Sequence, residues 1–200
     1  MELEEIEWLM FGCAPIMAIF VAMMVYNAIR SSRRKEQLLE RDMRFGNEYR
    51  TWRENVKNDG GINHTFCPMS LEGGERCFAF EDAVAFYEPA STGILYRRDL
   101  GAETECGADV EPGWSVTDCF DEVRFIGNGR LLVSDRRVCF SGTGLRRAIP
   151  LEDVRSVAAA CSGVILETRS KDRPMLFNGI NGQRVRDTIL ILMRTGEDGN

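Results

Sequence analysis

Histidine is almost absent from this sequence, which contains a single one, His64. Its seven cysteines include no Cys-x-x-Cys pair, and it has no Gly-x-Ser-x-Gly motif and no phosphate-binding loop. Zinc sites need closely spaced pairs of ligands, so the cysteines are better explained as reduced, buried thiols of a cytosolic domain. We therefore expect no enzyme activity, no catalytic residues, no cofactor and no metal.

An excess of basic residues is also missing. The formal net charge is −6 and the isoelectric point is about 5.0. From Ile62 onward the chain has 16 Lys and Arg against 21 Asp and Glu, a balance of −5. A nucleic-acid binder needs a basic stripe to neutralise phosphates. The sequence therefore predicts no nucleic-acid partner, and the domain as a whole is repelled by anionic membranes.

What the sequence does contain is one long apolar run, from Trp8 to Tyr26. A helix of this length is about 28 Å long, close to the thickness of a bilayer core. We expect a transmembrane helix over residues 8–29, and the alternative is a buried core helix of a soluble protein. The residues taken to mark the span are Trp8, Phe11, Pro15, Ile19 and Tyr26.

The flanks of this run predict how it is inserted. Residues 1–7 carry four glutamates, whereas the other flank has the basic residues Arg30, Arg33, Arg34 and Lys35. A cleaved signal peptide would have a positive start, so the run reads as an uncleaved anchor. The positive-inside rule predicts a single-pass protein of the plasma or inner membrane, with an extracytoplasmic stub and a cytoplasmic C-terminal domain.

Residues 30–61 are predicted to form a juxtamembrane linker helix that ends at the Asp59-Gly60-Gly61 turn. Its apolar residues recur at helical spacing, which places them on one face. That face is either a seam for self-association, a contact with the following domain, or one side of a solvated spacer. The residues concerned are Leu38, Phe45, Tyr49, Trp52 and Val56.

Residues 62–196 are predicted to be mainly β with a capping helix, followed by a disordered tail at 197–200. Short apolar runs separated by turns predict many antiparallel strands, and Asn181 is a good N-cap for a terminal helix over 181–194. Within the long acidic stretch from Asp99 to Asp121, the part from Leu100 to Pro112 is expected to be a loop. The expected strands are one that follows a turn within 71–80, one each at 83–87 and 93–98, one or two within 114–126, two in a hairpin over 129–140, and one each at 149–157, 164–168 and 174–177.

Two stretches resemble the pleckstrin-homology-like superfamily, in particular its GRAM and bacterial PH-like members. Gly129 to Phe140 is similar to that family's central hairpin, and Ile149 to Val157 is similar to its Ile-Pro-Leu-x-Asp-Ile-x-Ser-Val motif. The resemblance implies a bent, seven-stranded antiparallel barrel capped by a C-terminal helix. It also implies a binding module that docks onto proteins or lipids and performs no catalysis.

The function expected from these features is that of a membrane-anchored adaptor presenting a PH-like domain to a protein partner or to a second copy. The alternative is recognition of anionic lipid headgroups. Candidate lipid contacts are Arg30, Arg33, Arg34 and Lys35 beside the apolar run, and Arg136 and Arg137 in the central hairpin turn.

Overall fold

The structure is a computed structural model that describes the backbone of residues 3–89, 122–160, 162–170 and 173–197. Within these ranges it describes the side chains from Ile16 to Thr195. The chain divides into two compact units, Met1–Glu40 and Arg41–Asn200. The second unit therefore begins earlier than the predicted domain start at Ile62.

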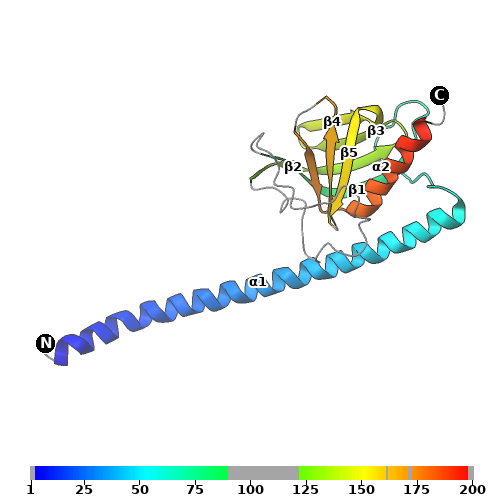
Figure 1. The fold of residues 1–200 in the computed structure, drawn as a ribbon. Coiled ribbons are helices and arrows are strands. Elements are labelled where there is room, and N and C mark those ends of the chain that lie inside the picture. Colours follow the sequence, from blue (N-terminus) through cyan, green and yellow to red (C-terminus); the bar gives the residue numbers. More distant parts are fainter. Residues whose placement is uncertain (1–2, 90–121, 161, 171–172, 198–200) are drawn as a thin grey trace. The chain divides into compact units, whose positions relative to one another are not determined.

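A single helix, α1 (Leu3–Asp59), runs through the first unit and into the second (Figure 1). It ends where the sequence predicts, because Gly60 adopts a left-handed φ of 72° and the Gly61 N–H donates to the carbonyl of Val56 at 3.1 Å. Such a glycine cap satisfies carbonyls of the last turn. The predicted linker helix is thus helical throughout its length.

The large apolar side chains of α1 are exposed from Ile16 to Ile29, including Ile19 at 64% and Tyr26 at 63%. The other residues predicted to mark the span, Trp8, Phe11 and Pro15, lie outside the described side chains. In the part of the chain with described side chains, no helix is both long enough and apolar enough to cross a membrane.

The second unit contains a seven-stranded antiparallel sheet with the order β4-β3-β2-β1-β7-β6-β5. This sheet and the helix α2 (Gly182–Glu197) give the mainly β architecture that the resemblance implied. Among the described residues, β4 and β5 do not pair, so the predicted barrel is open there. The strands are β1 (Cys77–Pro89), β2 (Val123–Ser134), β3 (Arg137–Gly142), β4 (Leu145–Pro150), β5 (Val154–Ala160), β6 (Gly163–Thr168) and β7 (Met175–Asn178).

Strand β1 joins the two halves of the sheet and bends between them. Ala83 has a φ of 58°, and the pairing of β1 with β2 shifts register between Glu81 and Val84. A bulge of this kind bends a strand and increases its twist. Consequently β2 pairs along the whole of β1, whereas β7 pairs with it only from Ala85 to Tyr87.

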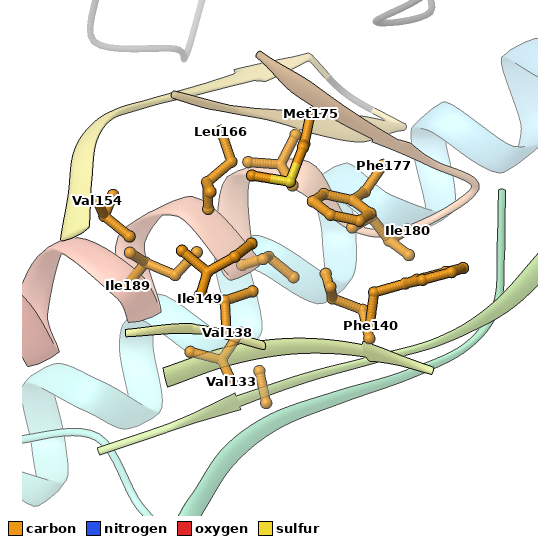
Figure 2. Close-up of a cluster of buried hydrophobic side chains, with 14 of the residues drawn as sticks. Val133, Val138, Phe140, Ile149, Val154, Leu166, Met175, Phe177, Ile180 and Ile189 are labelled. Carbon is orange, nitrogen blue, oxygen red and sulfur yellow. The ribbon is translucent and has the colours of Figure 1, made fainter. Parts of the chain in front are cut away.

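The core lies between the two halves of the sheet and α2. Figure 2 shows Val133, Val138 and Phe140 pointing from one half of the sheet toward side chains of the other half. The rings of Phe140 and Phe177 lie 5.8 Å apart, and both are fully buried. Their partners from the other strands and from α2 are Ile149, Val154, Leu166, Met175, Ile180 and Ile189.

Helix α2 closes one side of this core. Its start is capped as predicted, because the side-chain oxygen of Asn181 accepts a hydrogen bond from the Arg184 N–H at 3.2 Å. One face of the helix lies in the core, since Val185 and Ile189 are fully buried and Leu192 nearly so. A short 3₁₀ helix, η2 (Leu151–Asp153), links β4 to β5 after Pro150.

Most of the predicted strands are present, with one correction. The predicted separate strands at 71–80 and 83–87 form the single strand β1, because the bulge at Ala83 bends the chain without ending the pairing. The predicted strand at 93–98 and the acidic stretch lie outside the described residues, as does the first part of 114–126. Strand β2 begins at Val123.

Candidate functional site

A hollow of about 320 Å³ lies between the end of α1, the first half of β1 and the start of α2. All of its lining residues belong to the compact unit from Arg41 to Asn200. Five aromatic or apolar side chains form one part of the lining, and amide, hydroxyl and charged groups form most of the rest. The residues that matter below are Trp52, Asn55, Val56, Asp59, Asn63, His64, Thr65, Phe78, Phe80 and Arg184.

The end of α1 is held in place by the start of α2. Phe45 is 7% exposed, and its carbonyl accepts a hydrogen bond from the Asn181 side-chain amide at 2.8 Å. One turn later the Tyr49 hydroxyl donates to Asp187 at 2.5 Å. Burial and this hydrogen bond raise the pKa of Tyr49 to about 12. The apolar face predicted on the linker helix is therefore a contact with its own domain.

The segment after α1 forms another wall of the hollow. The Asn63 side chain donates to Asp59 at 2.6 Å, which links the segment to the last turn of the helix. The Thr65 N–H donates to the carbonyl of Cys77 at 2.7 Å. Because β2 pairs with the other edge of β1 here, this bond is made on the edge that faces away from β2.

That edge of β1 has no neighbouring strand at the hollow. The pairing with β7 is confined to Ala85–Tyr87, and in the described chain no strand pairs with residues 77–82 on this side. Phe78, Ala79 and Phe80, which line the hollow, belong to this part of β1. An edge strand with an adjacent pocket is an arrangement that can accept an extended peptide.

Arg184 and Asp59, the charged residues at the hollow, each have a hydrogen-bond partner. Arg184 donates to Glu81 in an ion pair between α2 and β1. Burial raises the pKa of Glu81, although the Arg184 guanidinium opposes this shift. The carboxylate of Asp59 accepts the Asn63 hydrogen bond. A neutral, partly apolar ligand therefore fits the hollow better than a strongly charged one.

The residues around the hollow do not form a recognisable catalytic arrangement. His64 is exposed and is the single histidine of the chain. Across the ranges that the structure describes, no three His, Cys, Asp or Glu side chains are grouped so that they could hold a metal ion. The chemistry available at the hollow is hydrogen bonding and apolar contact.

The two arginines predicted to contact lipid in the central hairpin turn have different surroundings. Arg136 is exposed. The Arg137 side chain is only 16% exposed, and its guanidinium makes two hydrogen bonds to Glu75, at 3.0 and 2.8 Å, and a further one to Glu72. Arg137 thus has a structural role in fixing the turn, a role that the sequence did not reveal.

Glu75 is the centre of this buried polar cluster. Its carboxylate accepts hydrogen bonds from the Ser134 hydroxyl at 2.6 Å and from the Glu72 N–H at 2.9 Å, in addition to those from Arg137. Burial alone would raise the pKa of Glu75, but these hydrogen bonds and the Arg137 charge outweigh it and hold the pKa below its usual range. The charge of Arg137 is therefore balanced within the fold.

The other predicted lipid contacts, Arg30, Arg33, Arg34 and Lys35, are exposed side chains of α1. Many arginines of the second unit lie in ion pairs, which lowers the basic character of its surface. These pairs are Arg76 with Asp135, Arg124 with Glu88, Arg130 with Asp82 and Arg186 with Asp187.

Sequence reasoning found part of the hollow and missed the rest. Trp52 and Val56 were recognised as one face of a helix, but their spacing does not say what that face contacts. Phe78 and Phe80 looked like ordinary strand residues. The available signal was the pair of glycines after Asp59, since Gly60 and Gly61 end the helix and turn the chain away from its axis.

Comparisons with known proteins give limited information. No protein-family model matches the chain, and no curated protein matches it. Among solved structures it is similar to the Vps36 N-terminal PH domain, at 12% identity and a TM-score of 0.40, over 64% of this chain and 86% of that one. It is also similar to the C-terminal domain of an unknown protein from Leishmania infantum, at 11% identity and a TM-score of 0.31, over 37% and 72% of the two chains. The narrower GRAM assignment stays a prediction.

Proposed function

We propose that this protein is a membrane-anchored docking module whose second unit holds an extended segment of a partner protein beside β1. The observation that carries the proposal is the hollow of about 320 Å³ next to Phe78–Phe80, at the half of β1 that β7 does not reach. An extended peptide can hydrogen-bond to such an edge while an adjacent pocket receives one of its side chains.

The lining of the hollow indicates the chemistry of the segment. Trp52, Val56 and Phe78 offer an apolar surface to an aliphatic or aromatic side chain. Asn55 and Thr65 offer hydrogen-bonding groups for peptide amides. Because Arg184 is already paired with Glu81, a charged anchor residue would gain little there. The proposed ligand is an extended, neutral segment with one large apolar side chain.

Membrane attachment through α1 is the second part of the proposal. The exposed apolar side chains from Ile16 to Ile29 adjoin the apolar sequence from Trp8 to Pro15. Exposed apolar surface of this extent favours a lipid environment. The basic residues from Arg30 to Lys35 favour the orientation with the second unit in the cytoplasm. No catalytic step is part of the proposed function.

Photo-crosslinking in native membranes tests the docking site. A photoreactive amino acid in place of Asn63, at the rim of the hollow, should crosslink the full-length protein to a peptide segment that mass spectrometry can map. Val56→Glu should abolish this crosslink, because it puts a carboxylate into the apolar wall. Thr51→Glu is the matched control, since it adds the same charge to an exposed position of the same helix. An equal effect of both substitutions would refute the docking site.

A topology reporter tests the anchor independently. Alkaline phosphatase fused to the C-terminus of the full-length chain should be inactive if the second unit is cytoplasmic. Activity of this fusion would overturn the orientation. Extraction of the protein from membranes by alkaline carbonate would show that it is not an integral membrane protein, which would contradict the proposed anchor.

Recognition of anionic lipid is the second candidate function, and one observation favours it. Arg30, Arg33, Arg34 and Lys35 are all exposed directly after the apolar stretch of α1. Each can contribute about 1 kcal/mol of attraction to anionic headgroups. The engagement of Arg137 by Glu75 argues against a lipid site in the hairpin turn. Liposome flotation with neutral and anionic vesicles distinguishes the candidates, since only lipid recognition requires the anionic vesicles.

A further inference from the structure

The chain between α1 and β1 crosses the outer face of the first half of the sheet. We call residues 66–76 the strap. Its side chains Cys67, Met69 and Leu71 pack against Leu132 and Cys139 on that face. The strap thereby brings Cys67 next to Cys77, the first residue of β1.

The two thiols lie in the same cluster. Cys67 packs against the group of buried side chains that contains Cys77, and both are free cysteines. The backbone fixes their approach, because the Thr65 N–H donates to the carbonyl of Cys77 at 2.7 Å. The docking function proposed above makes no use of this pair.

The two sulfur atoms have different environments. Cys67 is half-buried, and its Sγ accepts a hydrogen bond from the Met69 N–H at 3.3 Å. Cys77 is 2% exposed, and its Sγ–H donates to the carbonyl of Ala79 at 3.4 Å. Burial raises the pKa of the Cys77 thiol to about 12. Cys67 is therefore the more accessible partner.

We propose that Cys67 and Cys77 form a redox-sensitive thiol pair that a peroxide converts to a disulfide, which fixes the strap to β1. The Cys67 thiolate attacks the peroxide and breaks its O–O bond, giving a sulfenic acid and hydroxide. The Cys77 sulfur then attacks the sulfenic sulfur, and the departing hydroxide takes the Cys77 proton as water. In total two thiols and one hydrogen peroxide give one disulfide and two waters.

A third cysteine makes the proposal specific. Cys139 packs in the same cluster, and its Sγ lies 4.0 Å from the carbonyl of Phe140. It is 1% exposed, so peroxide reaches it less easily than Cys67. The inference is that Cys67 pairs with Cys77 and that Cys139 stays reduced.

The test uses the full-length protein in detergent micelles. The reduced protein is treated with a small molar excess of hydrogen peroxide, the remaining thiols are alkylated, and the peptides are mapped by mass spectrometry. The expected product is a peptide pair linked through Cys67 and Cys77, with a loss of alkylation at both positions. In Cys77→Ser, dimedone should label Cys67 as the sulfenic acid. Cys139→Ser is the control and should leave the linked peptide unchanged.

Three results would overturn the proposal. They are a disulfide from either cysteine to Cys139, a disulfide between two chains through Cys67, and full alkylation of both thiols after the peroxide has been consumed. The unsubstituted protein alone distinguishes these results from the expected one. The test therefore does not depend on whether any variant folds.

Discussion

At the residue scale, the Glu75–Arg137 pair connects the strap to the turn between β2 and β3. Glu75 has a fully buried side chain, and Ser134 and the Glu72 N–H also bind its carboxylate. The same turn is held by the Arg76 N–H, which donates to Asp135 at 3.0 Å. One buried carboxylate thus links two segments that are far apart in the sequence.

Replacing this carboxylate should destabilise the fold strongly. Glu75→Gln removes the buried counterion of the Arg137 guanidinium and leaves only the exposed Glu72 carboxylate, so we expect a loss of about 3 kcal/mol in the free energy of unfolding. Urea denaturation of the variant and the parent measures this loss. Asp82→Asn is the matched control, because the Asp82–Arg130 pair is largely exposed and should contribute less than about 1 kcal/mol.

The same pair predicts a dependence of stability on acid. The folded-state pKa of Glu75 lies below its unfolded value. Its contribution is therefore fully present above the ordinary glutamate range and is lost as pH falls through the folded pKa. The parent should lose stability in acid more steeply than Glu75→Gln. The loss should begin at roughly pH 5. If the free energy of unfolding falls equally steeply with pH in the two proteins below that value, this assignment is wrong.

Tyr49 gives a prediction at the alkaline end of the pH range. Its pKa is raised to about 12, so its contribution to stability is constant below the ordinary tyrosine pKa and is lost as pH rises through the folded value. Tyr49→Phe removes the hydrogen bond to Asp187 and should cost about 1–2 kcal/mol at neutral pH. Ultraviolet titration should show a late-ionising tyrosine in the parent that the variant lacks. Tyr87→Phe is the control, and it should keep the late phase.

These residue-level contacts are the part of the molecule that the sequence predicted least well. Arg136 and Arg137 are neighbours of the same type, and no pattern distinguishes the exposed one from the paired one. The distinction depends on Glu75, which is distant in the sequence and comes close only because Cys77 pairs with Ser134. The spacing of residues along the chain therefore cannot predict a partner that strand pairing brings close.

At the scale of elements, α2 depends on a glycine at its first position. A Cβ added to Gly182 would lie 1.9 Å from the carbonyl oxygen of Gly163 and 2.3 Å from that of Ala160. The start of the helix is thus packed directly on the backbone of the turn between β5 and β6. No larger residue fits without moving α2 away from the core.

Gly182→Ala should therefore destabilise the protein by about 2 kcal/mol or more, in the range of overpacked sites. Gly46→Ala is the matched substitution, because Gly46 lies inside α1 and an added Cβ meets nothing within 4 Å. It should stabilise the protein by about 0.5–1 kcal/mol through helix propensity. Thermal unfolding of both variants gives the comparison. A stabilising Gly182→Ala would show that α2 does not pack as described.

Helices and strands were predicted better than side-chain contacts, because the sequence patterns that specify them are local. Leu131, Val133, Val138 and Phe140 alternate with outward-facing residues along the hairpin, and all four are buried in the core. The bend at Ala83 was not predictable, since alanine rarely adopts a positive φ. The free edge of β1 follows from that bend, which is why the hollow was missed.

At the scale of the whole molecule, the boundary of the second unit has an experimental consequence. Phe45 and Tyr49 contact Asn181 and Asp187, so the last part of α1 belongs to the folded unit that begins at Arg41. A fragment that starts at Ile62, where the sequence placed the boundary, lacks these contacts. The helical spacing of the apolar residues predicted the face but not its partner.

We expect the fragment 41–200 to be more stable than the fragment 62–200 by at least about 3 kcal/mol, the usual cost of losing a buried phenylalanine. Chemical denaturation of the two purified fragments measures the difference. The substitution Phe45→Ala in the longer fragment should lower its stability by most of this difference. Equal stability of the two fragments would mean that the end of α1 does not pack on the sheet in solution.

The order of the strands also has a consequence for synthesis of the protein. Strand β7 lies between β1 and β6, so the two halves of the sheet are joined by the strand that is made after the other six. While the ribosome still covers β7 and α2, the first four strands can pair with one another but cannot close the core. Phe86 and Phe140 then lack Phe177, whose ring contacts both of theirs. The nascent chain therefore exposes this apolar surface until β7 and α2 have emerged.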